Sequence, residues 1–319
     1  MRFLAIVCFC VLALPAQQRV EKATIDRWME ELSNWGRWGK TDQMGTVNLI
    51  TPAKRKSALT VVKDGVSISL SRDADTLKSL DNGNPFGHLM IATGQADDPM
   101  FAMDTYTMTY HGISLTHFDS LSHMFYRGKL YNGYSKLEID RKGAHQLAVT
   151  AFKNGFITRG VLMDIPRLKG VKYLDLSTPI MPSDLEAWEK KAGIKVGTGD
   201  IVFIRTGRWA RRAEKGPWNT ETACAGLHPS CARWLKQRDV AMLGADNNGE
   251  LMPSPVQGIA FPIHQLLIVA MGMPMFDNCD LEAVADRAAA LGRWEFLFTA
   301  SALAVPGGTG SPMNPIATF

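Results

Sequence analysis

Two histidines and an aspartate with a spacing suited to metal binding lie in the segment Thr116 to His123. In an extended backbone alternate side chains share a face, so His117 and Asp119 are expected to point one way and Phe118 the other. Imidazole nitrogens and carboxylate oxygens together bind divalent ions such as zinc. His123 follows four residues after Asp119, close enough to serve the same pocket as a ligand or as a proton carrier. We therefore expect the chemistry of this chain to be centred on this segment.

A metal ion needs three or four protein ligands, so His117 and Asp119 need partners from elsewhere in the chain. His264 lies at the start of a predicted helix. Asp277 directly follows a predicted strand, at the strand end where α/β proteins usually place ligands, and Asp246 is placed similarly after an earlier strand. Spacing alone does not favour a ligand role for any of these three residues. A role as a helix cap, or as a hydrogen-bonding partner that holds a loop, explains each of them at least as well.

The other histidines are less well placed for this site. His111 lies six residues before His117 on a predicted strand from Met103 to Leu115, and a regular strand would separate the two by about 20 Å. Only a bulge would bring His111 to the same ion. His88 and His145 lie in polar segments, and we expect both at the surface.

The composition is that of a folded protein. The chain has 319 residues and 46% hydrophobic content, enough for one large core, and its formal net charge of +4 is too small to favour a nucleic acid or a membrane as partner. No internal repeat or flexible linker divides it, so we expect a single domain over residues 17–319. The sequence has no P-loop and no GxSxG elbow, which argues against nucleotide binding and serine-hydrolase chemistry.

The N-terminus has the layout of a secretory signal. Arg2 is followed by an apolar run and then by Pro15-Ala16, and the run is too short to span a bilayer. We expect residues 1–16 to form a signal peptide and the mature protein to be exported, periplasmic or secreted. An oxidising compartment would permit a disulfide between Cys224 and Cys231, although two packed thiols explain these residues better.

Hydrophobic periodicity predicts a chain in which helices and strands alternate, which indicates the α/β fold class. Helices are expected over Ile25 to Leu32, Thr51 to Lys63, Pro182 to Gly193, Ser230 to Gln237, Pro262 to Ala270 and Leu281 to Leu291. Strands are expected over Val66 to Leu70, Met103 to Leu115, Gly160 to Ile165, Ile201 to Arg205, Val240 to Leu243, Met273 to Phe276 and Trp294 to Leu303. The polar segment from Asp73 to Pro99 is expected to be a long loop that could cover a site.

The segment from Thr116 to His123 resembles the HxGTHxDxPxH signature of the metal-dependent cyclase family, which includes bacterial kynurenine formamidases and isatin hydrolases. The resemblance to the longer, cyclase-like branch extends over Asn34–Gly39, Gly45–Pro52, Arg159–Asp164, Arg205–Gly207, Leu243–Asp246 and Gly307–Pro312. It implies a swivelling β/β/α single domain with a mixed sheet and a divalent metal cofactor, zinc or manganese. It also implies a homo-oligomer, either a dimer or a tetramer.

The resemblance further implies a role for each candidate residue. His117, Asp119 and His264 match metal ligands, Asp277 stands where the family usually has a glutamate, and His123 matches the histidine assigned to proton transfer.

Two departures from the family pattern weaken this ligand set. The first histidine of the signature falls on Ile113, which cannot bind a metal, and Leu115 offers no replacement. The aspartate at Asp277 is one methylene shorter than the usual glutamate. We therefore expect a reduced metal site.

Together these roles imply a metal-dependent hydrolase of C–N bonds, of the arylformamidase or cyclic amide hydrolase type. Its small-molecule substrate would be a cyclic amide, a lactone or an N-formyl amide, attacked by metal-activated water with His123 as general acid/base. The reduced ligand set leaves open an exported pseudoenzyme or small-molecule binding protein, and a metal-free lyase that uses His123 and Asp246 is a third alternative. Phe118, Trp35 and Trp38 could line an aromatic pocket, although packing explains them better.

Overall fold

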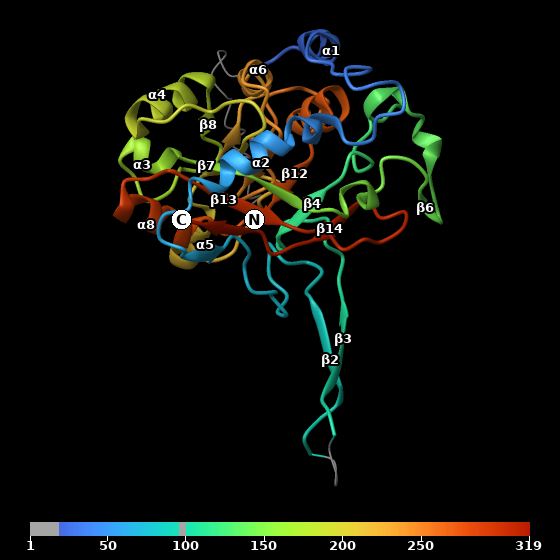
Figure 1. Ribbon diagram of the computed structural model, residues 1–319, viewed down its shortest axis with the longest axis vertical. Helices are drawn as coiled ribbons and strands as arrows, with labels where there is room; N and C mark the ends of the chain where they lie inside the picture. Colours follow the sequence, from blue (N-terminus) through green and yellow to red (C-terminus); the bar gives the residue numbers. More distant parts are fainter. Residues whose placement is uncertain (1–18, 96–99) are drawn as a thin grey trace, which may run out of the picture.

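The computed structural model describes residues 19–95 and 100–319, so the predicted signal peptide, residues 1–16, lies outside the described residues. One mixed sheet runs through the body of the molecule (Figure 1). Its nine strands have the order β1-β15-β13-β7-β9-β11-β12-β4-β14. Its strands are β1 (Ser67–Ser69), β4 (His117–Asp119), β7 (Phe156–Asp164), β9 (Ile201–Arg205), β11 (Met242–Ala245), β12 (Met275–Asp277), β13 (Glu295–Ala300), β14 (Gly310–Pro312) and β15 (Ile316–Thr318). The expected α/β fold class with a mixed sheet is confirmed.

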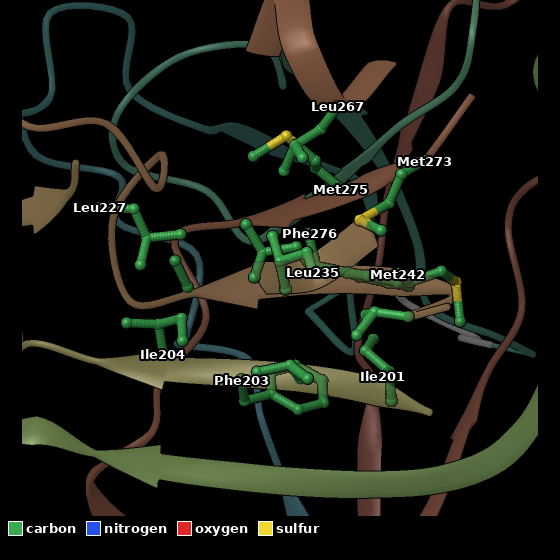
Figure 2. Packing of buried hydrophobic residues seen from close by; sticks show 14 of the residues in the cluster. Ile201, Phe203, Ile204, Leu227, Leu235, Met242, Leu267, Met273, Met275 and Phe276 are labelled. Atoms are coloured by element: carbon green, nitrogen blue, oxygen red, sulfur yellow. The ribbon is translucent and has the colours of Figure 1, made fainter. Parts of the chain in front are cut away.

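The four strands at the centre of the sheet, β7, β9, β11 and β12, run parallel to one another. All five residues of β9 are buried, which explains its continuous apolar sequence. Figure 2 shows the core on this part of the sheet, where Phe203 and Phe276 lie among aliphatic and methionine side chains. Gly244 on β11 leaves room for this packing, because a Cβ atom there would lie 2.4 Å from the Phe203 ring.

Helices connect the strands largely where the sequence predicts them. They are α1 (Lys22–Glu31), α2 (Pro52–Leu59), α3 (Ile165–Lys169), α4 (Pro182–Ala192), α5 (Arg208–Lys215), α6 (Cys231–Gln237), α7 (Pro262–His264) with a π-helix over Gln265–Met271, and α8 (Glu282–Leu291). Thr51 caps α2 by accepting a hydrogen bond from the backbone nitrogen of Lys54 at 3.1 Å, and Gly193 ends α4 in the left-handed conformation at φ 66°. Among the described residues, no helix has both the length and the apolar character to cross a membrane.

A projecting hairpin replaces part of the expected long loop. Strand β2 (Gly87–Ala92) pairs antiparallel with β3 (Met103–Thr107), and the pair extends away from the body as an arm (Figure 1). All five residues of β3 are exposed. The prediction of a loop from Asp73 to Pro99 is wrong over β2, because a strand that packs on neither face lacks the apolar alternation by which strands are recognised. Two short strand pairs complete the fold, β5 (Ile139–Asp140) with β6 (Gly143–Ala144) and β8 (Pro179–Ile180) with β10 (Gly226–Leu227).

The predicted strand from Met103 to Leu115 ends early, at Thr107. The chain then runs irregularly up to β4, and its carbonyl groups bond to side chains instead of a neighbouring strand. The Asn278 amide donates to the Gly112 carbonyl at 2.8 Å and to the Leu115 carbonyl at 3.1 Å. This change of direction decides where His111 lies.

The three described cysteines, Cys224, Cys231 and Cys279, are free and buried. The Cys231 thiol donates to the Ile180 carbonyl at 3.1 Å, whereas the Cys224 sulfur accepts from the Asn247 amide at 3.2 Å. The structure therefore shows two separately packed thiols and no bridge between Cys224 and Cys231. Burial raises the pKa of all three thiols, which leaves them neutral and poorly nucleophilic.

Candidate metal centre

The Asp119 carboxylate lies at the centre of the candidate site. It is fully buried, and neither of its oxygens accepts a hydrogen bond. Its Oδ1 atom lies 2.9 Å from Nδ1 of His111 and 3.5 Å from Nε2 of His117. Its Oδ2 atom lies 3.7 Å from Nε2 of His123 and 3.7 Å from Nε2 of His264. Each carboxylate oxygen thus faces its own pair of imidazoles.

Asp277 enters the site through strand pairing. Strand β4 lies between β12 and β14, and the β4–β12 register sets Asp277 opposite His117. Oδ2 of Asp277 lies 3.5 Å from Nε2 of His264. The structure therefore brings together all four predicted ligands, His117, Asp119, His264 and Asp277.

Two groups of ligand atoms share Asp119. One is His111, His117 and Asp119, and the other is Asp119, His264 and Asp277; within each group the ligand atoms all lie within 4.8 Å of one another. Tetrahedral ligands at about 2.1 Å from a zinc ion lie about 3.4 Å apart. The spacing in both groups is thus close to that of a metal site.

Three of the histidines are held by hydrogen bonds on the side away from Asp119. The outer partners are the Leu115 carbonyl for Nδ1 of His117 at 2.8 Å, the Thr309 hydroxyl for Nε2 of His111 at 2.9 Å, and the Glu250 carboxylate for Nδ1 of His264 at 2.9 Å. Each bond leaves the other ring nitrogen directed at Asp119. Metal-ligating histidines almost always have such an outer partner, which fixes the tautomer and the ring orientation.

The residues present fit a divalent metal ion. A buried carboxylate without a hydrogen bond is costly unless a positive group satisfies it. In Asp119 both oxygens are in this state, and imidazole nitrogens that are already oriented surround them. The donor set of nitrogen and carboxylate oxygen suits zinc and manganese alike.

His111 was expected to lie too far from His117 to share an ion, and this expectation is wrong. The chain leaves the strand at Thr107, and the irregular segment that follows folds His111 back onto Asp119. His111 thereby supplies an imidazole that Ile113, at the signature position, cannot. His111 is therefore a candidate ligand in addition to the four that were predicted from the sequence.

His123 lies at the edge of the site, where its side chain is 26% exposed. Its ring stacks on that of His111, with the centroids 3.9 Å apart and the planes 13° from parallel. Burial lowers the pKa of His123 to about 4, although the nearby Asp119 charge opposes this shift. The imidazole is therefore neutral at pH 7 and has a free lone pair, and its lowered pKa makes it a weaker base than an ordinary histidine.

The buried charges of the site influence one another strongly. Burial alone would raise the pKa of Asp119, but its electrostatic interactions with the nearby His123, His117 and His111 outweigh burial and hold that pKa well below the usual range. Burial alone would lower the pKa of His264, but the carboxylates of Asp277 and Glu250 outweigh it and raise that pKa well above the usual range. The site therefore keeps Asp119 ionised and ready to bind a cation.

A cavity of about 230 Å³ opens over the ligand groups. Its apolar walls are Ile113, Met124 and Phe261, and its further polar residues are Glu221 and Asn248. The aromatic residues considered from the sequence lie elsewhere. Phe118 is buried in the core against Phe152, Phe156 and Phe276, and Trp35 lines a different cavity with Tyr126 and Arg127.

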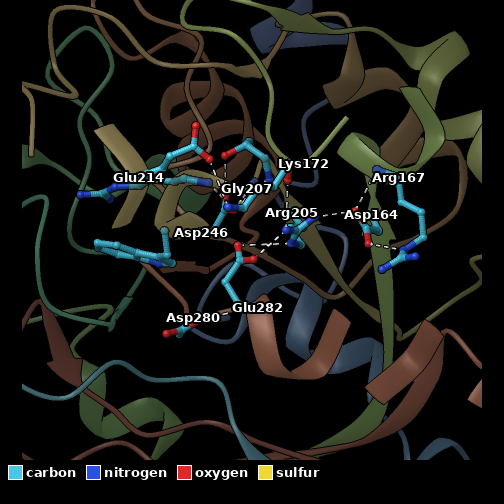
Figure 3. A network of polar contacts seen from close by, with 12 residues as sticks. Asp164, Arg167, Lys172, Arg205, Gly207, Glu214, Asp246, Asp280 and Glu282 are labelled. Carbon is cyan, nitrogen blue, oxygen red and sulfur yellow. Dashed lines mark hydrogen bonds and ion pairs between the residues drawn. The ribbon is translucent and has the colours of Figure 1, made fainter. Parts of the chain in front are cut away.

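Asp246 takes no part in either ligand group. Its Oδ2 atom accepts hydrogen bonds from the backbone nitrogens of Thr206 at 2.9 Å, Gly207 at 2.8 Å and Arg208 at 3.2 Å, at the start of α5. Figure 3 shows Asp246 in this network beside Arg205 and Glu282. These bonds satisfy free N–H groups at the N-terminus of α5, and Asp246 does not line the cavity, so the structure gives it neither the ligand role nor the lyase role considered from the sequence.

Two buried residues that the sequence patterns did not predict hold the site in place. Glu250 accepts from both Nδ1 and the backbone nitrogen of His264. Arg208 donates to the Ile113 carbonyl and, at 2.6 Å, to Oδ1 of Asn278, next to Asp277. Both residues lie a few positions after the end of a central strand, so the strand-end rule applied to Asp277 could have marked them.

The comparisons with known proteins agree with the resemblance found in the sequence. The family model named Cyclase matches residues 46–249. The crystal structure of a novel cyclase is 32% identical, covers 90% of this chain and 99% of its own chain, and has a TM-score of 0.80. Comparison with curated proteins gave no match.

Two isatin hydrolases have a similar fold at lower identity. Isatin hydrolase A from Ralstonia solanacearum is 19% identical, with a TM-score of 0.58 over 82% of this chain and 93% of that chain. Isatin hydrolase A from Labrenzia aggregata, bound to benzyl benzoate, is 20% identical, with a TM-score of 0.58 over 79% of this chain and 93% of that chain.

Proposed function

Because the chain belongs to the cyclase family, we propose that it is a metal-dependent hydrolase acting on a cyclic amide, a lactone or an N-formyl amide. The isatin hydrolases that share its fold support this substrate class, since isatin is itself a cyclic amide. A pocket walled by Ile113, Met124 and Phe261, with a volume of about 230 Å³, suits a small molecule of this kind.

The observation that carries the proposal is the position of Asp119 between two sets of ligand atoms. The residues that would hold a divalent ion are His111 and His117 on one side of Asp119, and His264 and Asp277 on the other. A bound divalent ion supplies Lewis acidity for the scissile carbonyl and lowers the pKa of water toward neutrality. The outer hydrogen bonds that His117, His111 and His264 make with Leu115, Thr309 and Glu250 keep the ligand atoms in position.

His123 would move the proton in this reaction. Its ring lines the cavity next to Asp119, where the imidazole can reach a water molecule in the site. It would then return the proton to the leaving nitrogen or oxygen. Stacking on His111 holds the ring in one orientation, so the proton is accepted and returned at a defined position.

Elemental analysis and a hydrolysis screen test this function. The purified protein is expected to contain zinc or manganese and to hydrolyse isatin, an N-formyl arylamine or an aryl lactone in a chelator-sensitive manner. Asp119→Asn should abolish metal binding and turnover. Asp140→Asn is the matched control, because Asp140 pairs with His145 at the surface, with about half of its side chain exposed.

The results separate the proposal from its alternative. A protein that binds neither metal would refute the proposed function. Ligand binding without turnover in either metal would instead favour the small-molecule binding protein considered from the sequence. The expected homo-oligomer and the expected export stay predictions.

A further inference from the structure

The loop from Trp218 to Ala223 contributes one carboxylate, that of Glu221, to the lining of the cavity. The side chain of Asn219 accepts from the backbone nitrogen of Glu221 at 3.0 Å, and the Trp218 indole donates across the loop to the Ala223 carbonyl at 2.8 Å. The Thr222 hydroxyl donates to the Asn219 carbonyl at 2.8 Å. These bonds brace a short turn, so Glu221 is presented to the cavity by a defined backbone.

Glu221 has no partner of its own in the described part of the chain. Its carboxylate makes no hydrogen bond or ion pair with any residue in 19–95 or 100–319, although other surface carboxylates such as Glu214 are paired with lysines. An exposed carboxylate without a partner is common at a surface. One that lines the cavity over a candidate metal centre is available to a ligand.

Glu221 also dominates the charge that a substrate would meet. Apart from the candidate ligands and His123, the lining consists of Glu221, Asn248, Gly112 and the apolar wall. Within the described chain, no lysine or arginine lines this cavity. A carboxylate on the substrate would therefore find no cationic side chain there, whereas an ammonium group would find Glu221.

We propose that Glu221 determines specificity at this site and selects substrates that carry a cationic nitrogen, such as a protonated amine or amidine, over substrates that carry a carboxylate. The inference rests on the proposed function, because it assumes that the reacting bond lies at the metal centre. The apolar body of the substrate packs on Ile113, Met124 and Phe261, and its cationic end faces Glu221. Because Glu221 is exposed, water and salt weaken the interaction, and we expect a preference of about 5- to 10-fold.

A matched pair of ligands measures this preference without turnover. Two aryl hydroxamic acids, one with a ring aminomethyl group and one with a ring carboxylate, both anchor on a metal through the hydroxamate. Their dissociation constants are measured by calorimetry on the zinc-loaded full chain. The wild type should bind the aminomethyl compound about 5- to 10-fold more tightly, Glu221→Gln should remove the difference, and Glu221→Lys should reverse it.

Glu186→Lys is the matched control, since it makes the same charge change at an exposed position on α4 that does not line the cavity. It should leave the preference unchanged, and high salt should reduce the preference in the wild type. Equal binding of the two compounds by the wild type, or a preference that survives in Glu221→Gln, overturns the role of Glu221 and leaves the proposed function standing. If neither hydroxamate binds, the metal centre itself has failed and the role of Glu221 falls with it.

Discussion

Nδ1 of His111 lies 2.9 Å from Oδ1 of Asp119, eight positions further along the chain. An extended strand would have carried His111 far from the site. Because the strand ends at Thr107, His111 instead completes a ligand group with His117 and supports the ring of His123 by stacking. The site therefore depends on an irregular segment as well as on the sheet.

His111→Ala should remove one ligand from the group that faces Oδ1 of Asp119. We expect metal affinity to fall at least 10-fold and turnover to fall with it, because the remaining His117 and Asp119 are too few to hold an ion tightly. Equilibrium dialysis with zinc measures the affinity. His88→Ala is the control, since His88 pairs with Asp104 on the exposed arm. Unchanged zinc affinity in His111→Ala would remove His111 from the ligand set.

His123→Gln should separate proton transfer from metal binding. The glutamine keeps a polar side chain at the edge of the site but cannot take and return a proton. We expect the rate of hydrolysis to fall by about 10²- to 10⁴-fold, the usual contribution of general acid–base catalysis, while metal content stays near the wild-type value. If metal content and rate fall together, His123 is a ligand and not the proton carrier.

Glu250→Gln should weaken the site without touching a ligand. Glu250 accepts from both Nδ1 and the backbone nitrogen of His264, and a glutamine keeps an acceptor oxygen but loses the negative charge, so it holds the imidazole less firmly. Changes of this kind usually lower metal affinity by about 10- to 100-fold. The affinity is compared with that of Glu186→Gln, which makes the same chemical change on the surface of α4. Equal zinc affinity in the two variants would assign Glu250 a purely structural role.

Asp81→Asn should change the acid stability of the protein. Burial would raise the pKa of Asp81, but hydrogen bonds from Arg212 and Ser79 outweigh it and hold the pKa below its usual value. A lowered folded pKa stabilises the protein above the unfolded pKa of about 3.9, and this contribution is lost as the pH falls through the folded pKa. The variant should therefore be less stable than the wild type at pH 7, by about 1–3 kcal/mol.

Urea unfolding at pH 7 and at several values below pH 4 measures this linkage. The difference in unfolding free energy between wild type and Asp81→Asn should shrink as the medium becomes more acidic. Asp73→Asn is a control in the same loop, at an exposed position. A difference that is constant with pH would show that the charge of Asp81 is not what stabilises the loop.

Short-range patterns in the sequence by themselves determine several local features of this protein, namely which side chains share a strand face and where helices begin and end. Alternation along an extended backbone predicts that His117 and Asp119 share a face, and the structure confirms that both approach His111 and the candidate metal position. Local capping chemistry predicts the start of α2 at Thr51 and the end of α4 at Gly193. These features depend on residues within one turn or one strand, so the sequence contains all the information they need.

Only the tertiary structure determines which distant residues come together in the two ligand groups. Asp277 lies opposite His117 because β12 pairs with β4, and Glu250 bonds to His264, fourteen positions later in the chain. The positions of His111 and Glu221 depend on loops whose bonds go to distant side chains or across a turn. Such contacts cannot be predicted from local periodicity. The reason is that the packing of segments far apart in the chain sets strand register and loop direction.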